Sequence, residues 1–351
     1  MFMVGLRGTE LSADERSLLR EYRFGGFILF NHNLNDPKQI LALCRSLWDL
    51  GEELPPFIAI DQEGGRVHRL PPPFTHFPPA AELGRTGNSD LAYRVGVATA
   101  RELAAVGVNL NFAPVLDAHS NPANPVIGDR ALSSDPKEVA RLGTAMIRGL
   151  REGGVIPCAK HFPGHGDTAQ DSHVELPVVR RELDGLKSVE LPPFVQACGD
   201  GVEAVMTAHV LYPALDPDYP ATLSRNVVTG LLRGELGYDG VVFSDDLEMK
   251  AISENYPREE EVVLGVNAGV DVLMFAHQTE LAMQACEFLC QQTEENPQIR
   301  TGIKKSCQRI KKLKLRHLKS FKGMARDILK KHIGTTRHKK LGEKIIKAGR
   351  D

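Results

Sequence analysis

Short apolar runs alternate with longer amphipathic stretches along most of the chain. Eight of these runs end in polar or glycine-rich turns and are predicted to be strands, at residues 3–6, 25–30, 56–61, 108–115, 156–162, 203–210, 240–246 and 270–275. Helical segments lie between them, and several begin at Asp or Ser and end at Gly, as capped helices do. This alternation predicts an α/β fold, and eight strands favour a (β/α)8 TIM barrel over an open doubly wound sheet.

The composition changes near residue 300. No linker or internal repeat interrupts residues 1–300, which are predicted to form one barrel domain. Residues 301–351 hold 18 Lys and Arg against 3 Asp and Glu, whereas the whole chain has a net charge of −2. We expect a basic, helical C-terminal extension there. Its lysines are interpreted as a solvated helix face, and contact with an anionic surface (cell-wall fragments, nucleic acid or acidic lipid) is the alternative.

The sequence has no features of an exported or membrane protein. It has no basic segment followed by a long apolar run at its start, and no apolar stretch long enough to span a bilayer. Six cysteines are scattered without CxxC spacing and are expected to be reduced thiols. We therefore expect a cytoplasmic protein with no membrane span.

Polar residues collect directly after the predicted strands, where a TIM barrel carries its chemistry. The seventh strand ends in Asp245 and Asp246, whose side chains should point to opposite sides because strand side chains alternate. One of these carboxylates is expected to be catalytic, and the other to cap the segment that follows.

The segment AKHFPGHGDTAQDSH, residues 159–173, is unusually rich in histidine and aspartate. Its proline and glycines predict a loop after the fifth strand. Asp171 and His173 are two residues apart, and a carboxylate that orients an imidazole gives a general acid/base near neutral pH. The alternative is that these polar side chains are solvated loop residues without a catalytic role. A metal site is not expected, because the HxH and HExxH spacings are missing.

The third strand is followed by DQEGGRVHR, which contains Asp61, Glu63 and Arg69. Mixed carboxylates and arginines suit a neutral, hydroxyl-rich ligand, and the two glycines are too few for a phosphate loop. Arg130, in GDRALSSDP, is a further candidate donor, although a single loop arginine more often forms a structural ion pair.

Taken together, KHFPGHGDTAQDSH, DQEGGRVHR, GDR and FSDDLEM, in their spacing along the chain, resemble glycoside hydrolase family 3. The likeness is strongest to the single-domain bacterial β-N-acetylhexosaminidases of peptidoglycan recycling, and it runs from about residue 1 to about residue 300. It implies that residues 1–300 are a catalytic (β/α)8 domain. It also implies release of terminal β-linked N-acetylglucosamine by a retaining mechanism without metal or other cofactor.

The resemblance also implies a role for individual residues. Asp245 matches the family's nucleophile, His173 its acid/base and Asp171 the partner of that histidine, while Asp246 becomes a structural acid. The matched sugar-binding positions are Asp61, Arg69, Arg130, Lys160 and His161.

Two other functions remain open from the sequence. A β-N-acetylglucosaminide phosphorylase would use the same nucleophile and dyad, because a histidine repels phosphate less than a glutamate does. A catalytically silent sugar-binding barrel is the other. The expected ligand is a carbohydrate such as an N-acetylglucosaminyl muropeptide, with no nucleic acid partner, and the expected state is a monomer.

Overall fold

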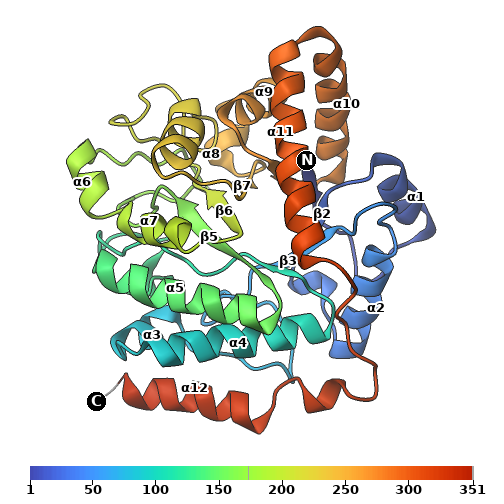
Figure 1. Cartoon of the computed structure of the whole chain (residues 1–351), viewed down its shortest axis with the longest axis vertical. Helices are drawn as coiled ribbons and strands as arrows, with labels where there is room; N and C mark the ends of the chain where they lie inside the picture. Colours follow the sequence, from blue (N-terminus) through green and yellow to red (C-terminus); the bar gives the residue numbers. More distant parts are fainter. Residues whose placement is uncertain (173, 350–351) are drawn as a thin grey trace.

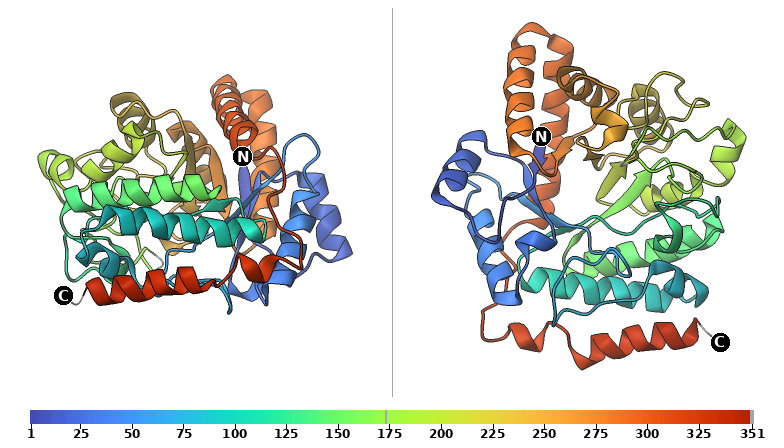
Figure 2. Two further views of the ribbon diagram at one scale, coloured as in Figure 1. Left: turned by 60° about the horizontal axis from the view of Figure 1, so that its bottom comes forward. Right: turned by 180° about the vertical axis from the view of Figure 1, so that it is seen from behind.

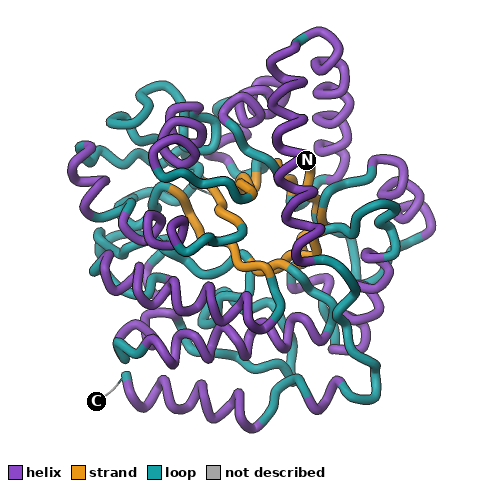
Figure 3. Tube along the Cα trace, viewed as in Figure 1, coloured by secondary structure: helices purple, strands orange, loops and turns teal. Residues whose placement is uncertain are grey.

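Eight parallel strands close into a barrel in the computed structural model of the chain, which describes residues 1–172 and 174–349. Each strand pairs with the next along the chain, β8 pairs with β1, and the ring of strands is visible in Figure 3. The (β/α)8 barrel expected from the sequence is confirmed. The strands are β1 (Phe2–Val4), β2 (Gly26–Leu29), β3 (Phe57–Ile60), β4 (Leu110–Asn111), β5 (Ile156–Phe162), β6 (Ala204–Thr207), β7 (Val241–Asp246) and β8 (Val272–Phe275).

Alternate side chains of the strands fill the inside of the barrel. They form one buried cluster, in which the ring of Phe243 meets Phe57 and Phe112 edge-on at 5.7 and 5.6 Å between centroids. The residues between them face outward and pack under the surrounding helices in a second, larger cluster. The two-residue period of a strand therefore decides which side chains line the barrel and which hold its helices.

Helices surround the barrel (Figure 1), and the predicted caps begin several of them. Asp36 accepts backbone hydrogen bonds at the start of α2, Asp135 does so at α5, and Gly154 ends α5 with a φ of 93°. The α-helices are α1 (Ala13–Tyr22), α2 (Pro37–Trp48), α3 (Ala80–Arg85), α4 (Ser89–Ala105), α5 (Pro136–Gly153), α6 (Leu183–Ser188), α7 (Pro192–Gly199), α8 (Lys250–Ser253), α9 (Arg258–Ala268), α10 (Thr279–Glu295), α11 (Pro297–His317) and α12 (Thr336–Ala348). A π-helix, η3 (Asn226–Glu235), and three short 3₁₀ helices, η1 (Asn31–Asn33), η2 (Gly128–Arg130) and η4 (Leu329–Lys331), complete the set within the described residues.

The structure differs from the predicted elements in two places. The strand predicted at 108–115 pairs regularly only at Leu110–Asn111, because Pro114 has no N–H to donate to a ladder. The helical segment expected between the fifth and sixth strands is divided into α6 and α7 before Pro192, since a proline inside a helix removes a hydrogen bond and clashes with the preceding turn.

The basic C-terminal segment is helical, as predicted, and it packs on the barrel. Ile310, Leu313 and Leu318 join the cluster inside the barrel and cover its amino-terminal end, while Lys314 Nζ donates to the carbonyl of Gly25 at 2.8 Å. Helix α11 runs through residue 300, and the domain division at that residue stays a prediction.

Helix α12 packs on α3 and α4, which Figure 2 shows from a second side. Buried Glu102 on α4 accepts hydrogen bonds from the backbone N–H of Gly334 at 3.0 Å and from His338 Nδ1 at 2.6 Å. Within the described residues, no helix has the length and apolar character needed to cross a membrane.

Candidate active site

Seven of the eight site residues predicted from the sequence line one pocket at the carboxyl-terminal end of the barrel. The pocket has a volume of about 240 Å³, and β5, β6, β7, β8 and the loops after β3, β4 and β5 build its wall. The eighth residue, His173, lies outside the described residues. The seven are Asp61, Arg69, Arg130, Lys160, His161, Asp171 and Asp245.

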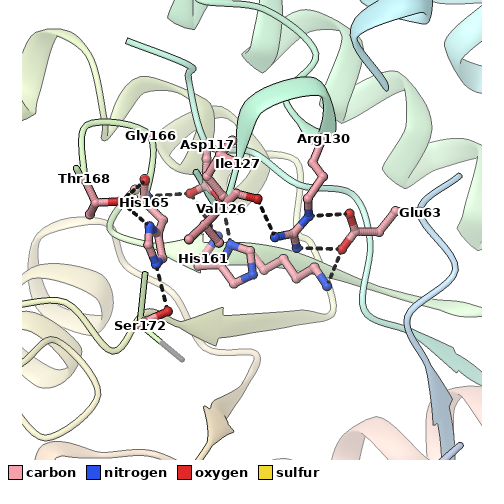
Figure 4. A network of polar contacts seen from close by, with 12 residues as sticks. Glu63, Asp117, Val126, Ile127, Arg130, His161, His165, Gly166, Thr168 and Ser172 are labelled. Atoms are coloured by element: carbon pink, nitrogen blue, oxygen red, sulfur yellow. Dashed lines mark hydrogen bonds and ion pairs between the residues drawn. The ribbon is translucent and has the colours of Figure 1, made fainter. Parts of the chain in front are cut away.

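A buried ion network forms one side of the pocket. Lys160 Nζ donates to Asp61 Oδ1 at 2.6 Å and lies 2.7 Å from Glu63 Oε1. Arg130 faces the same glutamate as a two-pronged donor, at 2.9 and 2.8 Å (Figure 4). Burial opposes ionisation of Glu63, but the charges of Lys160 and Arg130 outweigh it and hold its pKa well below the usual range. The network therefore presents fixed charges in a defined geometry.

His161 is held by a carboxylate behind it. Its Nδ1 donates to Asp117 Oδ2 at 2.7 Å, and the other oxygen of Asp117 accepts the backbone N–H of His165 at 2.7 Å. Burial opposes the charge on Asp117, yet His161 and these donors lower its pKa below the usual range, so that it is a carboxylate. The ring of His161 is thereby fixed, and Nε2 has no hydrogen-bond partner among the residues described here.

The loop after β5 is tied down at its start. Tyr212 donates its hydroxyl to the carbonyl of Gly164 at 2.6 Å, and the amide of Asn124 donates to the carbonyl of His165 at 2.8 Å. The two ring nitrogens of His165 contact the hydroxyls of Thr168 at 2.9 Å and Ser172 at 3.2 Å. Burial lowers the pKa of His165 to about 4, so this ring is neutral at physiological pH.

Asp245 and Asp246 point in different directions, as strand alternation predicted. Asp245 lines the pocket; burial opposes its charge, but His161, His209 and the backbone N–H of Asp246 lower its pKa below the usual range. Asp246 instead accepts the backbone N–H groups of Glu248 and Ala276, each at 3.1 Å, and burial raises its pKa to about 7. The first is an ionised group facing the pocket, and the second organises the turn after β7.

Arg69 and Asp171 complete the pocket from its two facing loops. The guanidinium of Arg69 lies 5.9 Å from the centre of the Phe30 ring. The carbonyl of Asp171 accepts the backbone N–H groups of Val174 and Glu175 at 2.9 and 3.0 Å. No cluster of three or more His, Cys, Asp or Glu suited to a metal ion occurs within residues 1–172 and 174–349.

Asp117 and His165 were not chosen from the sequence, and Glu63 was named there without a specific role. Glu63 joins Lys160 to Arg130, Asp117 fixes His161, and His165 connects two parts of the loop. The rule that placed Asp61 and Asp245 at strand ends applies equally to Asp117, which follows β4. The roles of Glu63 and His165 depend on partners that only the folded chain reveals.

The sequence of the chain matches one known family over most of its length. The model of the glycosyl hydrolase family 3 N-terminal domain matches residues 1–313. The β-hexosaminidase of Alkalilimnicola ehrlichii is 43% identical over 284 residues, which cover 79% of this chain and 81% of that protein.

Two solved structures are similar over nearly the whole chain. The family 3 β-N-acetylglucosaminidase of a Paenibacillus species superimposes with a TM-score of 0.90 at 42% identity, covering 98% of this chain and 66% of that one. NagZ of Neisseria gonorrhoeae, solved with N-trifluoroacetyl-D-glucosamine, has a TM-score of 0.82 at 30% identity and is covered over 97% of its length. This chain therefore spans about two thirds of the Paenibacillus protein and nearly all of the Neisseria protein.

Proposed function

Given that the chain belongs to glycosyl hydrolase family 3 and is a β-hexosaminidase, as its sequence predicted, we propose that it removes terminal β-linked N-acetylglucosamine with retention of configuration. The observation that carries the mechanism is Asp245, an ionised carboxylate at the end of β7 that faces a pocket rich in hydrogen-bonding groups. A lowered pKa keeps this group a nucleophile at neutral pH.

The reaction proceeds in two displacements. Asp245 attacks the anomeric carbon while His173, as imidazolium, gives its proton to the leaving oxygen, so the glycosidic bond breaks as the glycosyl-enzyme ester forms. Neutral His173 then takes a proton from water, which attacks the same carbon and releases Asp245. Asp171 orients the ring of His173 and stabilises its charged form. The roles of His173 and Asp171 are proposed from the family resemblance.

The ion network supplies the contacts to the sugar. The ammonium of Lys160 has three protons and faces two carboxylates, Asp61 and Glu63, which leaves one proton for a sugar hydroxyl. Arg69 and Arg130 add donors, and His161 lines the pocket beside the nucleophile. Asp61 is proposed to accept hydroxyl protons distal to the cleaved bond.

The natural substrate proposed is an N-acetylglucosaminyl muropeptide. The support is the resemblance to enzymes of peptidoglycan recycling, and on the same ground we propose that the protein is cytoplasmic, acts as a monomer and needs no cofactor.

Turnover of p-nitrophenyl N-acetyl-β-glucosaminide tests the proposal, with the corresponding β-glucoside as the comparison substrate. We expect activity that needs the acetamido group, resists chelator and is abolished in Asp245→Asn. Asp246→Asn is the matched control, because an Asn oxygen still accepts the N–H groups of Glu248 and Ala276. Equal loss in both variants would contradict the assigned nucleophile.

The same assay separates the two alternatives. Added phosphate that yields a sugar 1-phosphate would identify a phosphorylase. A protein that binds N-acetylglucosamine but releases no nitrophenol from any glycoside would be a silent sugar-binding barrel.

A further inference from the structure

A second pocket, of about 340 Å³, lies between η3, α9 and α11, away from the site described above. Its wall reaches the amino-terminal ends of the strands, since Arg233 donates to the carbonyl of Gly240, directly before β7. Four of its lining residues are cationic and none is acidic. The cations are Arg225, Arg233, Lys305 and Arg309.

Helical spacing brings these charges together. Thr229 and Arg233 lie on η3, Arg225 directly precedes its first residue, and Lys305 and Arg309 are four residues apart on one face of α11. Helices α11 and η3 both pack against α9, and residues of all three line this pocket.

One buried carboxylate pairs with two of these four cations. Asp271, fully buried, accepts from Arg233 at 2.8 Å and from Arg309 at 3.0 Å. The exposed Asp239 lies 3.9 Å from Arg309 but is bonded to Lys312 at 2.8 Å. The two arginines therefore share a single buried negative charge.

The other two cations, Arg225 and Lys305, have no carboxylate partner within the described residues. Arg225 makes one long contact, 3.4 Å to the carbonyl of Asn267, and Lys305 makes no hydrogen bond or ion pair within the described residues. Several like charges around one cavity repel one another, and a bound anion relieves that repulsion.

Capping of α9 accounts for only part of this arrangement. Thr229 donates to the carbonyl of Ala268 at 2.6 Å and Arg233 to that of Gly269 at 3.0 Å, which satisfies the end of the helix. Lys305 and Arg309 donate to none of these carbonyls. Arg309 is held in the pocket by Asp271, whereas no contact within the described residues accounts for Lys305.

We propose that this pocket binds the phosphate group of a small molecule. Guanidinium groups donate to phosphate oxygens through paired N–H groups, and a lysine adds a compact charge. The volume exceeds what a bare ion fills, which favours a phosphate ester over free phosphate. The site is separate from the glycosidase pocket, with which it shares no lining residue.

Calorimetric titration of the full chain with inorganic phosphate and with glucose 6-phosphate tests this site. The variant is Arg225→Gln with Lys305→Gln, because both side chains are exposed and neither holds Asp271. Lys304→Gln is the control, an exposed neighbour on α11 that does not line the pocket. Sodium chloride at matched ionic strength controls for screening.

We expect wild type and Lys304→Gln to bind with the same affinity, and the double variant to bind at least about tenfold more weakly, since each lost charge-assisted hydrogen bond has roughly that effect. Turnover of the nitrophenyl substrate should be equal in all three proteins, which shows that the fold is intact. Tighter binding of glucose 6-phosphate would identify an ester as the ligand, and equal binding would identify free phosphate. No binding of either compound, or equal affinity in the double variant, would overturn the proposal.

Discussion

Replacing Glu63 by Gln removes the charge that joins Lys160 to Arg130. Glu63 is 6% exposed, Lys160 3% and Arg130 13%, so all three charges are held away from water. The variant keeps the pair of Lys160 with Asp61, but it leaves buried Arg130 facing a neutral amide in place of a carboxylate. Breaking a buried ion pair on one side costs about 3 to 5 kcal/mol, so we expect a loss of stability of that order.

The loss should depend on pH in a defined direction. The folded-state pKa of Glu63 lies below that of the unfolded chain, so its contribution is complete above about pH 4.3 and is lost as pH falls toward the folded value. The gap between wild type and Glu63→Gln should therefore be constant near neutral pH and narrow in acid.

Urea denaturation followed by circular dichroism measures this gap. Glu138→Gln is the control, because Glu138 pairs with Arg141 on the surface, where such a pair contributes at most about 1 kcal/mol. The KM for the nitrophenyl substrate should also rise, since Lys160 and Arg130 lose their shared anchor. A stability loss no larger than that of Glu138→Gln would refute the reasoning.

Three further predictions concern other parts of the fold. Burial lowers the pKa of Lys314 to about 8, so the wild type should gain up to about 3 kcal/mol of stability as pH rises from about 8 to 10.4, and denaturation of Lys314→Met should lack this slope. Glu102→Gln weakens the bond to His338, so hydrogen exchange should show faster opening of α12, whereas unchanged protection would count against this anchor. His165→Ala removes the link to Ser172, so kcat should fall about tenfold or more with little change in KM; an unchanged kcat would exclude this positioning role.

Sequence patterns predicted the barrel because each local signal agreed with the global fold. Apolar runs marked all eight strands, and Asp36 and Asp135 marked helix starts that the structure confirms. The strand-end rule also placed Asp61 and Asp245 on one rim, since parallel strands all end at the same face.

Contacts between residues that are far apart in the sequence could not be predicted from local patterns. Asp117 and His161 are 44 positions apart and meet only because β4 and β5 are neighbours in the closed barrel. Ile310 and Leu313 stand among lysines, so their pattern indicated a surface helix, whereas α11 uses them to cover the barrel. Burial of such residues depends on how the helix is placed, which local periodicity does not determine.

The stereochemistry of the first product tests the central claim, a glycosyl-enzyme ester on Asp245, most directly. Proton NMR of N-acetylglucosamine released from the nitrophenyl substrate distinguishes its anomers before they interconvert. Two displacements at one carbon predict that the β-anomer appears first and then equilibrates. The α-anomer as first product would contradict a covalent intermediate and assign Asp245 a different role.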